Sequence, residues 1–293
     1  MTPSPTDVAA LHTVLLDWFD RHARDLPWRR DPSPWPVLVS ELMLQQTPVV
    51  RVLPVFEAWM LRWPAPPDLA AEPAGEAVRA WGRLGYPRRA LRLHAAAVAI
   101  VEQHGGDVPA DHDDLLALPG VGEYTAAAVA SFAFGQRHVV LDTNVRRVLA
   151  RVADGQQYPA PAVTAAERRL AGSVLPEVGA HRWAAATMEL GATVCTARSP
   201  RCGDCPVADL CRWRAAGHPE HVGPPRRGQA WDGTDRQCRG RLLAVLRDST
   251  DPVTLAQLEA AWPDQQQRMR CLDSLVADGL VQPAAGSTYT LPG

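Results

Sequence analysis

The chain has 293 residues, of which 46% are hydrophobic, and a formal net charge of −2 at pH 7. This length allows one large domain or two to three small ones, and the hydrophobic fraction is ample for a buried core. A charge so close to zero excludes a global electrostatic attraction to nucleic acid, so such affinity must come from local basic patches. The sequence has no apolar run of membrane-spanning length and no secretory signal pattern, so we expect a cytoplasmic protein without a membrane partner.

The first third of the chain reads as helices separated by proline-rich breaks. Apolar residues recur at helical spacing over residues 8–23, which predicts an amphipathic helix. Prolines at positions 32, 34 and 36 predict an extended segment. Helices are expected to resume over residues 37–47, 50–63 and 88–104.

Glu41 is the one charged residue between Asp31 and Arg51, and most of its neighbours in the predicted helix are apolar. A carboxyl group in apolar surroundings has a raised pKa, because desolvation penalises the charged form, and it can then act as a general acid at neutral pH. Gln45 follows on the same helical face. The pattern by itself favours a plainer interpretation, a solvent-facing glutamate on an amphipathic helix.

Residues 118–122 read Leu-Pro-Gly-Val-Gly, which predicts a tight turn because glycines adopt backbone angles that other residues avoid. A short helix is expected over residues 113–118 and a buried, Ala-rich helix over residues 124–134. A helix, a glycine hairpin and a second helix together bind a DNA phosphate through backbone amides. A Gly-x-Gly before a helix is common, however, and is weak evidence alone.

Asp142 ends a hydrophobic run and precedes a predicted helix over residues 144–151. Aspartate at such a position is most often an N-cap. Two observations favour a further role. Asn144 is the only asparagine in the chain, and residues 118–151 carry four arginines against two acidic residues.

Four of the six cysteines, Cys195, Cys202, Cys205 and Cys211, are separated by six, two and five residues. So dense a cluster in a cytoplasmic protein indicates metal ligands rather than disulfides, with zinc as the generic alternative to iron–sulfur. The cluster segment is basic, with four arginines against two aspartates. Cys238 and Cys271 read as small core residues.

The C-terminal part has its own pattern. Helices are predicted over residues 239–247, 255–261 and 265–277, followed by a β-hairpin of residues 280–282 and 289–291. Three helices and a hairpin resemble a winged-helix module. Six arginines and six acidic residues cancel in it, so DNA binding and packing against the rest of the chain remain equally open.

Residues 8–213 resemble the helix-hairpin-helix DNA glycosylase superfamily, which includes endonuclease III and the MutY-type adenine glycosylases. The hairpin with Asp142, the stretch Ser-Glu-Leu-Met-Leu-Gln-Gln-Thr at 40–47, Leu-Gly-Tyr at 84–86 and the cysteine spacing carry the resemblance. It implies an all-α, two-lobed fold with an iron–sulfur loop, followed by the winged-helix-like α+β module. The expected domains are an iron–sulfur domain (1–24 and 136–213), a six-helix domain (25–135), a linker (214–235) and the C-terminal module (236–293).

The resemblance implies a base excision repair glycosylase, a monomer in the bacterial cytoplasm or on the nucleoid, that hydrolyses the N-glycosidic bond of adenine mispaired with 8-oxoguanine or guanine in double-stranded DNA. Glu41 would protonate the adenine and Asp142 would stabilise the sugar cation, with Tyr124 and Asn144 assisting. Endonuclease III carries a lysine where Tyr124 stands. Because this chain contains no lysine, the resemblance implies base removal without efficient strand cleavage.

The resemblance also assigns binding residues. The cysteines Cys195, Cys202, Cys205 and Cys211 would hold a [4Fe–4S] cluster. The residues expected to contact DNA or the adenine are Arg24, Trp28, Gln45, Gln46, Tyr86, Leu118, Gly120, Val121, Gly122 and Glu189.

The sequence departs from the family's pattern in two places. Pro87 stands where a second aromatic residue usually follows Tyr86, and these 293 residues hold nothing of the length of the C-terminal domain that usually reads 8-oxoguanine in MutY. How the lesion would be sensed is therefore an open question. Two alternative functions stay open: an endonuclease III-like enzyme for thymine mismatches or oxidised pyrimidines, and a non-catalytic iron–sulfur DNA-binding regulator.

Overall fold

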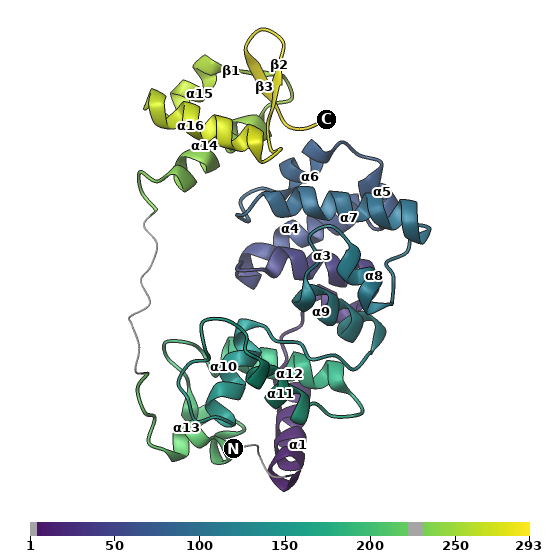
Figure 1. The fold of residues 1–293 in the computed structure, drawn as a ribbon, viewed down its shortest axis with the longest axis vertical. Helices are drawn as coiled ribbons and strands as arrows, with labels where there is room; N and C mark the ends of the chain where they lie inside the picture. The colour runs from purple at the N-terminus through teal and green to yellow at the C-terminus, as the bar shows by residue number, and fades with distance from the viewer. Residues whose placement is uncertain (1–4, 222–230) are drawn as a thin grey trace. The chain divides into compact units, whose positions relative to one another are not determined.

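The computed structural model describes residues 5–221 and 231–293, which are mainly helical (Figure 1). The chain divides into two compact units. The first comprises residues 1–37, 110–116 and 122–225, and the second comprises residues 38–109, 117–121 and 226–293. In the described ranges, no helix combines the length and the apolar character needed to cross a bilayer.

The described part of the first unit consists of helices and connecting loops, without strands. Its helices are α1 (Pro5–His22), α2 (Pro27–Arg30), α9 (Glu123–Phe134), α10 (Thr143–Val152), α11 (Ala165–Ser173), α12 (Ala180–Thr193) and α13 (Arg212–Ala215), with 3-10 turns η1 (Cys202–Asp204) and η2 (Ala208–Leu210). The second unit contains α4 (Val49–Arg62), α5 (Pro66–Ala70), α6 (Ala74–Trp81), α7 (Arg88–His104), α14 (Asp235–Asp248), β1 (Val253–Thr254), α15 (Leu255–Ala261), α16 (Gln265–Ala277), β2 (Gln282–Ala284) and β3 (Thr288–Thr290). Helices α3 (Pro34–Leu44) and α8 (His112–Ala117) begin in the first unit and end in the second.

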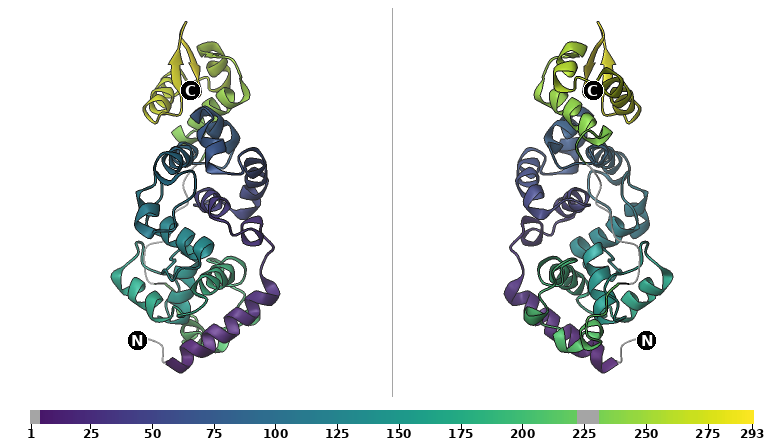
Figure 2. Two further views of the ribbon diagram at one scale, coloured as in Figure 1. Left: turned by 90° about the vertical axis from the view of Figure 1, so that its right-hand side faces the viewer. Right: turned by 90° about the vertical axis from the view of Figure 1, so that its left-hand side faces the viewer.

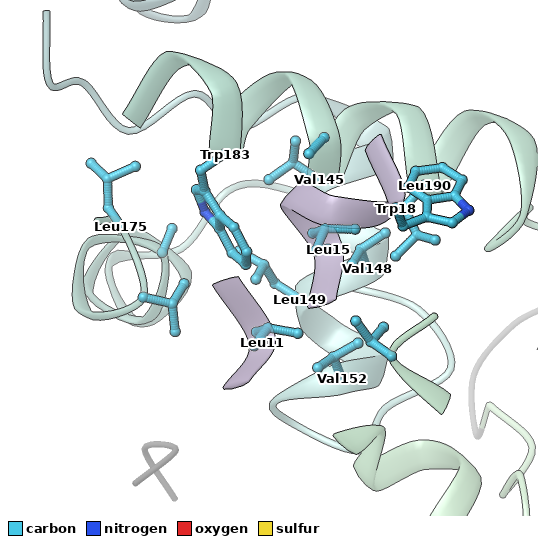
Figure 3. Packing of buried hydrophobic residues seen from close by; sticks show 14 of the residues in the cluster. Leu11, Leu15, Trp18, Val145, Val148, Leu149, Val152, Leu175, Trp183 and Leu190 are labelled. Carbon is cyan, nitrogen blue, oxygen red and sulfur yellow. The ribbon is translucent and has the colours of Figure 1, made fainter. Parts of the chain in front are cut away.

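The core of the first unit forms where α1 and α10 pack on α12. Figure 3 shows Leu15 of α1 beside Val145 and Val148 of α10, with Trp183 of α12 close by. These side chains are at most 4% exposed. Burial of apolar side chains of this size stabilises the fold by roughly 1.5–3 kcal/mol each. This core holds α10 and α12 together, the two helices that carry Asn144 and Glu189.

The core of the second unit's helical part includes three tryptophans, Trp59, Trp63 and Trp81, each at most 1% exposed. The ring of Trp59 packs edge to face against Trp63 at 4.6 Å and against Trp81 at 5.9 Å. Such aromatic pairs add about 0.5–1.5 kcal/mol beyond their buried area. Helices α5 and α6 pack on α7, which therefore lies at the centre of this part.

The C-terminal module has three helices and a three-stranded antiparallel sheet in the order β1-β3-β2. Figures 1 and 2 show the hairpin of β2 and β3 beside helices α14 to α16. Arg79 of α6 donates to the carbonyls of Arg247 and Ser249, and the amide of Gly75 donates to the Pro292 carbonyl at 2.7 Å. The module is thus hydrogen-bonded to α6.

The all-α fold with a small C-terminal α+β module agrees with the prediction, and several helices coincide with their predicted ranges. Cys238 and Cys271 are buried, as predicted, at 0% and 1% exposure. The extended segment predicted at the prolines was wrong, because α3 begins at Pro34. Proline in a first turn lacks only an N–H that needs no helical partner. The predicted domain boundaries remain a prediction, and residues 222–230 of the predicted linker lie outside the described residues.

Candidate active site and DNA-contacting elements

Glu41 lies in the second half of α3, and 6% of it is exposed. Its helical neighbours Leu38 and Leu42 are fully buried. This burial contradicts the plainer interpretation of a solvent-facing glutamate. Glu41 is therefore a buried carboxyl group on a mainly apolar helix.

Asp142 is the N-cap of α10, and its carboxylate accepts three hydrogen bonds. Oδ1 accepts from the backbone N–H of Asn144 at 2.9 Å and of Val145 at 2.6 Å. Oδ2 accepts from the side-chain amide of Asn144 at 2.6 Å. Burial raises the pKa of Asp142 above its ordinary value, and these hydrogen bonds oppose the shift. Asp142 therefore does cap the helix, and it also accepts a hydrogen bond from the Asn144 side chain that N-capping does not require.

Asn144 is itself fixed from two sides. Its Oδ1 accepts from Arg147 at 2.8 Å, while its amide donates to Asp142. A Cβ added at Gly191 would lie 2.6 Å from the Cβ of Asn144, so α12 approaches this position closely because residue 191 has no side chain. The pair of Asp142 and Asn144 is therefore pre-organised by packing as well as by hydrogen bonds.

Tyr124 is the second residue of α9 and packs, partly buried, against a small apolar cluster. Buried members of this cluster are Ala127, Ala128 and Val140. Val140 lies two residues before Asp142. Tyr124 and the segment that ends at Asp142 therefore share one packing environment in the first unit.

The glycine turn at residues 118–122 has the backbone that the sequence predicted. Gly120 has φ +81°, in the left-handed region, and the Val121 amide donates to the Leu118 carbonyl at 3.1 Å. A Cβ at Gly120 would lie 2.6 Å from the Cβ of Arg92 in α7. Gly122 is the N-cap of α9 and has no side chain with which to cap it. A helix start of this kind suits an anionic ligand.

Gln46 and Tyr86 are both exposed, Tyr86 by 53%, whereas Gln45 is half-buried. Gln46 lies between α3 and α4, and Tyr86 lies between α6 and α7. Both loops belong to the second unit. Two exposed side chains on short, anchored loops are suited to entering a base stack.

Arg24 and Glu189, predicted together for the adenine pocket, are joined in the first unit. Glu189 is fully buried, and its Oε1 accepts from Nε of Arg24 at 2.7 Å. Arg29, which the sequence reasoning missed, donates to Oε2 of the same carboxylate at 2.8 Å. Burial by itself raises the pKa of Glu189, but the hydrogen bonds and charges of Arg24 and Arg29 outweigh it and hold the pKa below its ordinary value. Trp28, in α2 between the two arginines, is 9% exposed.

The four clustered cysteines line one small hollow in the first unit. Burial raises the pKa of the Cys205 thiol to about 12, and the other three cysteines add to the effect. Four thiolates gathered in such a place need positive charge, which bound iron supplies. No three described His, Cys, Asp or Glu side chains converge on a single ion. In a [4Fe–4S] cluster each thiolate binds a different iron, so the sulfurs need not converge.

Two arginines of α10 contact the cysteine loop. Arg151 is 1% exposed and lies 3.2 Å from the sulfur of Cys195, while its guanidinium packs over the Trp213 ring at 4.7 Å. Arg147 donates to the Cys195 carbonyl at 2.8 Å. The helix that Asp142 caps is thus directly connected to the cysteine loop, a link that sequence spacing did not reveal.

Comparison with known proteins identifies the family. Residues 39–171 match the HhH-GPD superfamily of base excision DNA repair proteins, and residues 195–211 match the iron–sulfur binding domain of endonuclease III. Over 72% of this chain and 98% of the other, the fold is similar to a thermostable thymine-DNA glycosylase, with a TM-score of 0.65 and 27% identity. The chain accordingly has the helix-hairpin-helix glycosylase fold and a [4Fe–4S] cluster loop.

Relatives that match over nearly their whole length have a higher sequence identity to this chain. An adenine DNA glycosylase of Mycolicibacterium smegmatis is 55% identical over 95% of each chain. An adenine DNA glycosylase of Mycobacterium tuberculosis is 52% identical over 99% of this chain and 97% of its own length. Likeness of this extent, with both domain matches, shows that the chain belongs to the adenine DNA glycosylase family of base excision repair.

Proposed function

We propose that this glycosylase removes adenine paired with 8-oxoguanine or guanine in double-stranded DNA and acts as a monomer on the bacterial chromosome. The observation that carries the proposal is Glu41, a carboxyl group 6% exposed in an otherwise apolar helix segment. A buried carboxyl group can serve as a general acid, which is the role that base removal requires. The relatives named above as adenine DNA glycosylases support adenine as the base.

Glu41 and Asp142 divide the chemistry of one bond cleavage. The target adenine leaves the stack, and Glu41 donates a proton to its ring so that it departs as a neutral base. Asp142 stabilises the positive charge that develops on the sugar, and water completes the hydrolysis. Asn144 directs Oδ2 of Asp142 through their 2.6 Å hydrogen bond. Tyr124 assists beside the sugar.

DNA is held by several elements. The amides of residues 118–122 and the start of α9 bind one backbone phosphate, with Leu118 and Val121 fixing the turn through their burial. Gln45, Gln46 and Tyr86 enter the duplex around the target. Arg24, Trp28 and Glu189 line the adenine pocket, and the ion pairs of Glu189 keep that pocket rigid.

The proposed cluster ligands are Cys195, Cys202, Cys205 and Cys211. When bound, the cluster supplies structural cross-linking and positive charge rather than a step in base removal. The cysteine loop is joined to α10 through Arg147 and Arg151. It therefore helps to position the helix that Asp142 caps.

The proposed enzyme is monofunctional. Strand cleavage through a Schiff base needs an amine nucleophile, and the chain has no lysine. Tyr124, at the position of the endonuclease III lysine, cannot form that bond. Base removal should therefore leave an intact strand with an alkali-labile abasic site.

A panel of duplexes tests this proposal. Purified enzyme is incubated with A:8-oxoguanine, A:G, A:T, T:G and oxidised-pyrimidine duplexes, and cleavage is scored with and without hot alkali. We expect strand breaks for the two adenine mispairs only, and only after alkali. The likeness to a thymine-DNA glycosylase motivates the T:G duplex. Release of thymine would overturn the proposed substrate. Strand breaks without alkali would overturn the proposal that the enzyme is monofunctional.

A further inference from the structure

Gln46 and Tyr86 share an unusual backbone. Their φ angles are +55° and +48°, and among the described residues only His218 and Ser287 are other non-glycine residues with positive φ. The left-handed region is unfavourable for a residue with a side chain. Such residues persist where the surrounding structure holds them, and they concentrate at functional sites.

One side chain reaches both loops. Arg89, in the first turn of α7, is 5% exposed. Its Nη1 donates to the Leu42 carbonyl at 3.0 Å and to the Gln45 carbonyl, and its Nη2 lies 3.5 Å from the Gly85 carbonyl. Arg89 therefore bonds the residue before Gln46 and contacts the residue before Tyr86.

Further contacts fix the same junction. The Arg89 guanidinium lies 5.0 Å from the ring centroid of Tyr86, a cation–π contact. The indole of Trp81 donates to the Gly85 carbonyl at 3.0 Å. The hydroxyl of buried Thr47 donates to the Leu84 carbonyl at 3.2 Å. The two loops are thus bonded to each other as well as to Arg89.

Besides the Gly85 carbonyl, the acceptors of Arg89 are carbonyls at and just after the end of α3, where the helix dipole is negative, and the Thr47 hydroxyl. This placement explains how a positive charge is buried there. It also ties the end of the helix that carries Glu41 to α7. The planar guanidinium, with its fork of donors, suits several acceptors at once, which a point-like ammonium does not.

We propose that Arg89 is a positioning residue that holds Gln46 and Tyr86 in their left-handed conformations as one rigid pair before DNA binds. The proposal rests on the proposed role of these two side chains in entering the duplex. Rigid presentation lowers the ordering cost of binding, so the pair is ready to disrupt the stack on contact.

A double-mutant cycle tests it. Single-turnover adenine release is measured for Arg89→Met in the natural chain and in a chain with Gln46→Ala and Tyr86→Ala. We expect Arg89→Met to slow release by about 10–100-fold, as a misplaced positioning group does. In the doubly substituted background it should cause almost no further loss, because the residues through which it acts are gone. Arg88→Met, which removes the neighbouring charge paired with Asp278, is the matched control and should change little.

A second readout separates positioning from general damage. 2-Aminopurine placed beside the target adenine brightens when the stack opens, and Arg89→Met should suppress that rise without loss of cooperative melting. If Arg89→Met does not fold, Arg89→Lys keeps the charge and the stem but loses the fork, and it should show a smaller loss of both signals. Additive rate losses in the cycle, or full activity of a folded Arg89→Lys, would overturn the proposal. Full activity of the Gln46→Ala, Tyr86→Ala chain would instead refute the proposed role of those side chains.

Discussion

The side-chain amide of Asn144 donates to Oδ2 of Asp142 over 2.6 Å. Oδ1 of the same carboxylate accepts from the backbone amides of Asn144 and Val145. Both oxygens are therefore oriented by the first turn of α10, and rotation of the carboxylate would break all three bonds. The only asparagine of the chain stands at this position.

Substitution of Asn144 by Ala should slow adenine release by about 10-fold or more, since Oδ2 loses its fixed direction. The free energy of unfolding should fall by only about 1 kcal/mol, the usual worth of a hydrogen bond. Single-turnover kinetics and thermal melting measure the two effects. Thr143→Ala, at the exposed neighbouring position, is the control. An unchanged rate for Asn144→Ala would show that Asn144 has no role in base removal.

The raised pKa of Asp142 predicts two pH effects. Catalysis needs the carboxylate, so the rate should fall with acid through a pKa above the ordinary aspartate range. The contribution of Asp142 to stability changes with pH in the opposite direction. A carboxyl group whose pKa is raised by folding contributes fully below its unfolded pKa and loses that contribution as pH rises through the folded pKa. The melting temperature of Asp142→Asn, which keeps an N-cap, should therefore gain on that of the natural chain as pH rises. A constant difference across pH would contradict this.

Gly120→Ala should weaken DNA binding and lower the free energy of unfolding by roughly 1–3 kcal/mol. The alanine would need φ near +81° and would meet the Cβ of Arg92 at 2.6 Å. Gly105→Ala is a matched control, because Gly105 has φ +67° with nothing within 4 Å of an added Cβ. Anisotropy titrations with abasic-site DNA should show a larger affinity loss for Gly120→Ala. Equal affinities of the two variants would argue against a phosphate contact by the hairpin.

Iron content should depend on the four clustered cysteines and not on the other two. Cys205→Ser should lose iron and sulfide and melt at a lower temperature, because the loop that Arg151 anchors loses its cross-link. Cys238→Ser, a buried cysteine of the C-terminal module, should keep its iron. Iron analysis beside melting curves measures both. An unchanged iron content in Cys205→Ser would show that Cys205 is not a cluster ligand.

Local pattern in the sequence predicted much of the fold. The Ala-rich helix α9 and the periodic helices α1, α7 and α16 follow from composition and spacing. The start of α3 did not, because three prolines near it read as extended, although prolines are tolerated in a first helical turn. Glu41 is buried in the folded chain, whereas its sequence pattern alone favoured exposure.

Contacts between residues far apart in the sequence could not be predicted from local pattern. Arg29 and Glu189 are 160 residues apart and meet only in the folded first unit. Arg89 bonds carbonyl oxygens, and backbone acceptors leave no trace in side-chain patterns. The left-handed backbone of Gln46 and Tyr86 could not be predicted either, because neither position is a glycine.

The central claim is that Glu41 and Asp142 together break the bond between adenine and its sugar. Single-turnover release from an A:8-oxoguanine duplex, measured for Glu41→Gln and Asp142→Asn with Glu57→Gln on the exposed face of α4 as control, tests it most directly. Each of the first two variants should lose at least 100-fold in rate, within the range known for general acid–base catalysis, and should keep DNA binding and melting temperature. Near-normal release by either variant would contradict it.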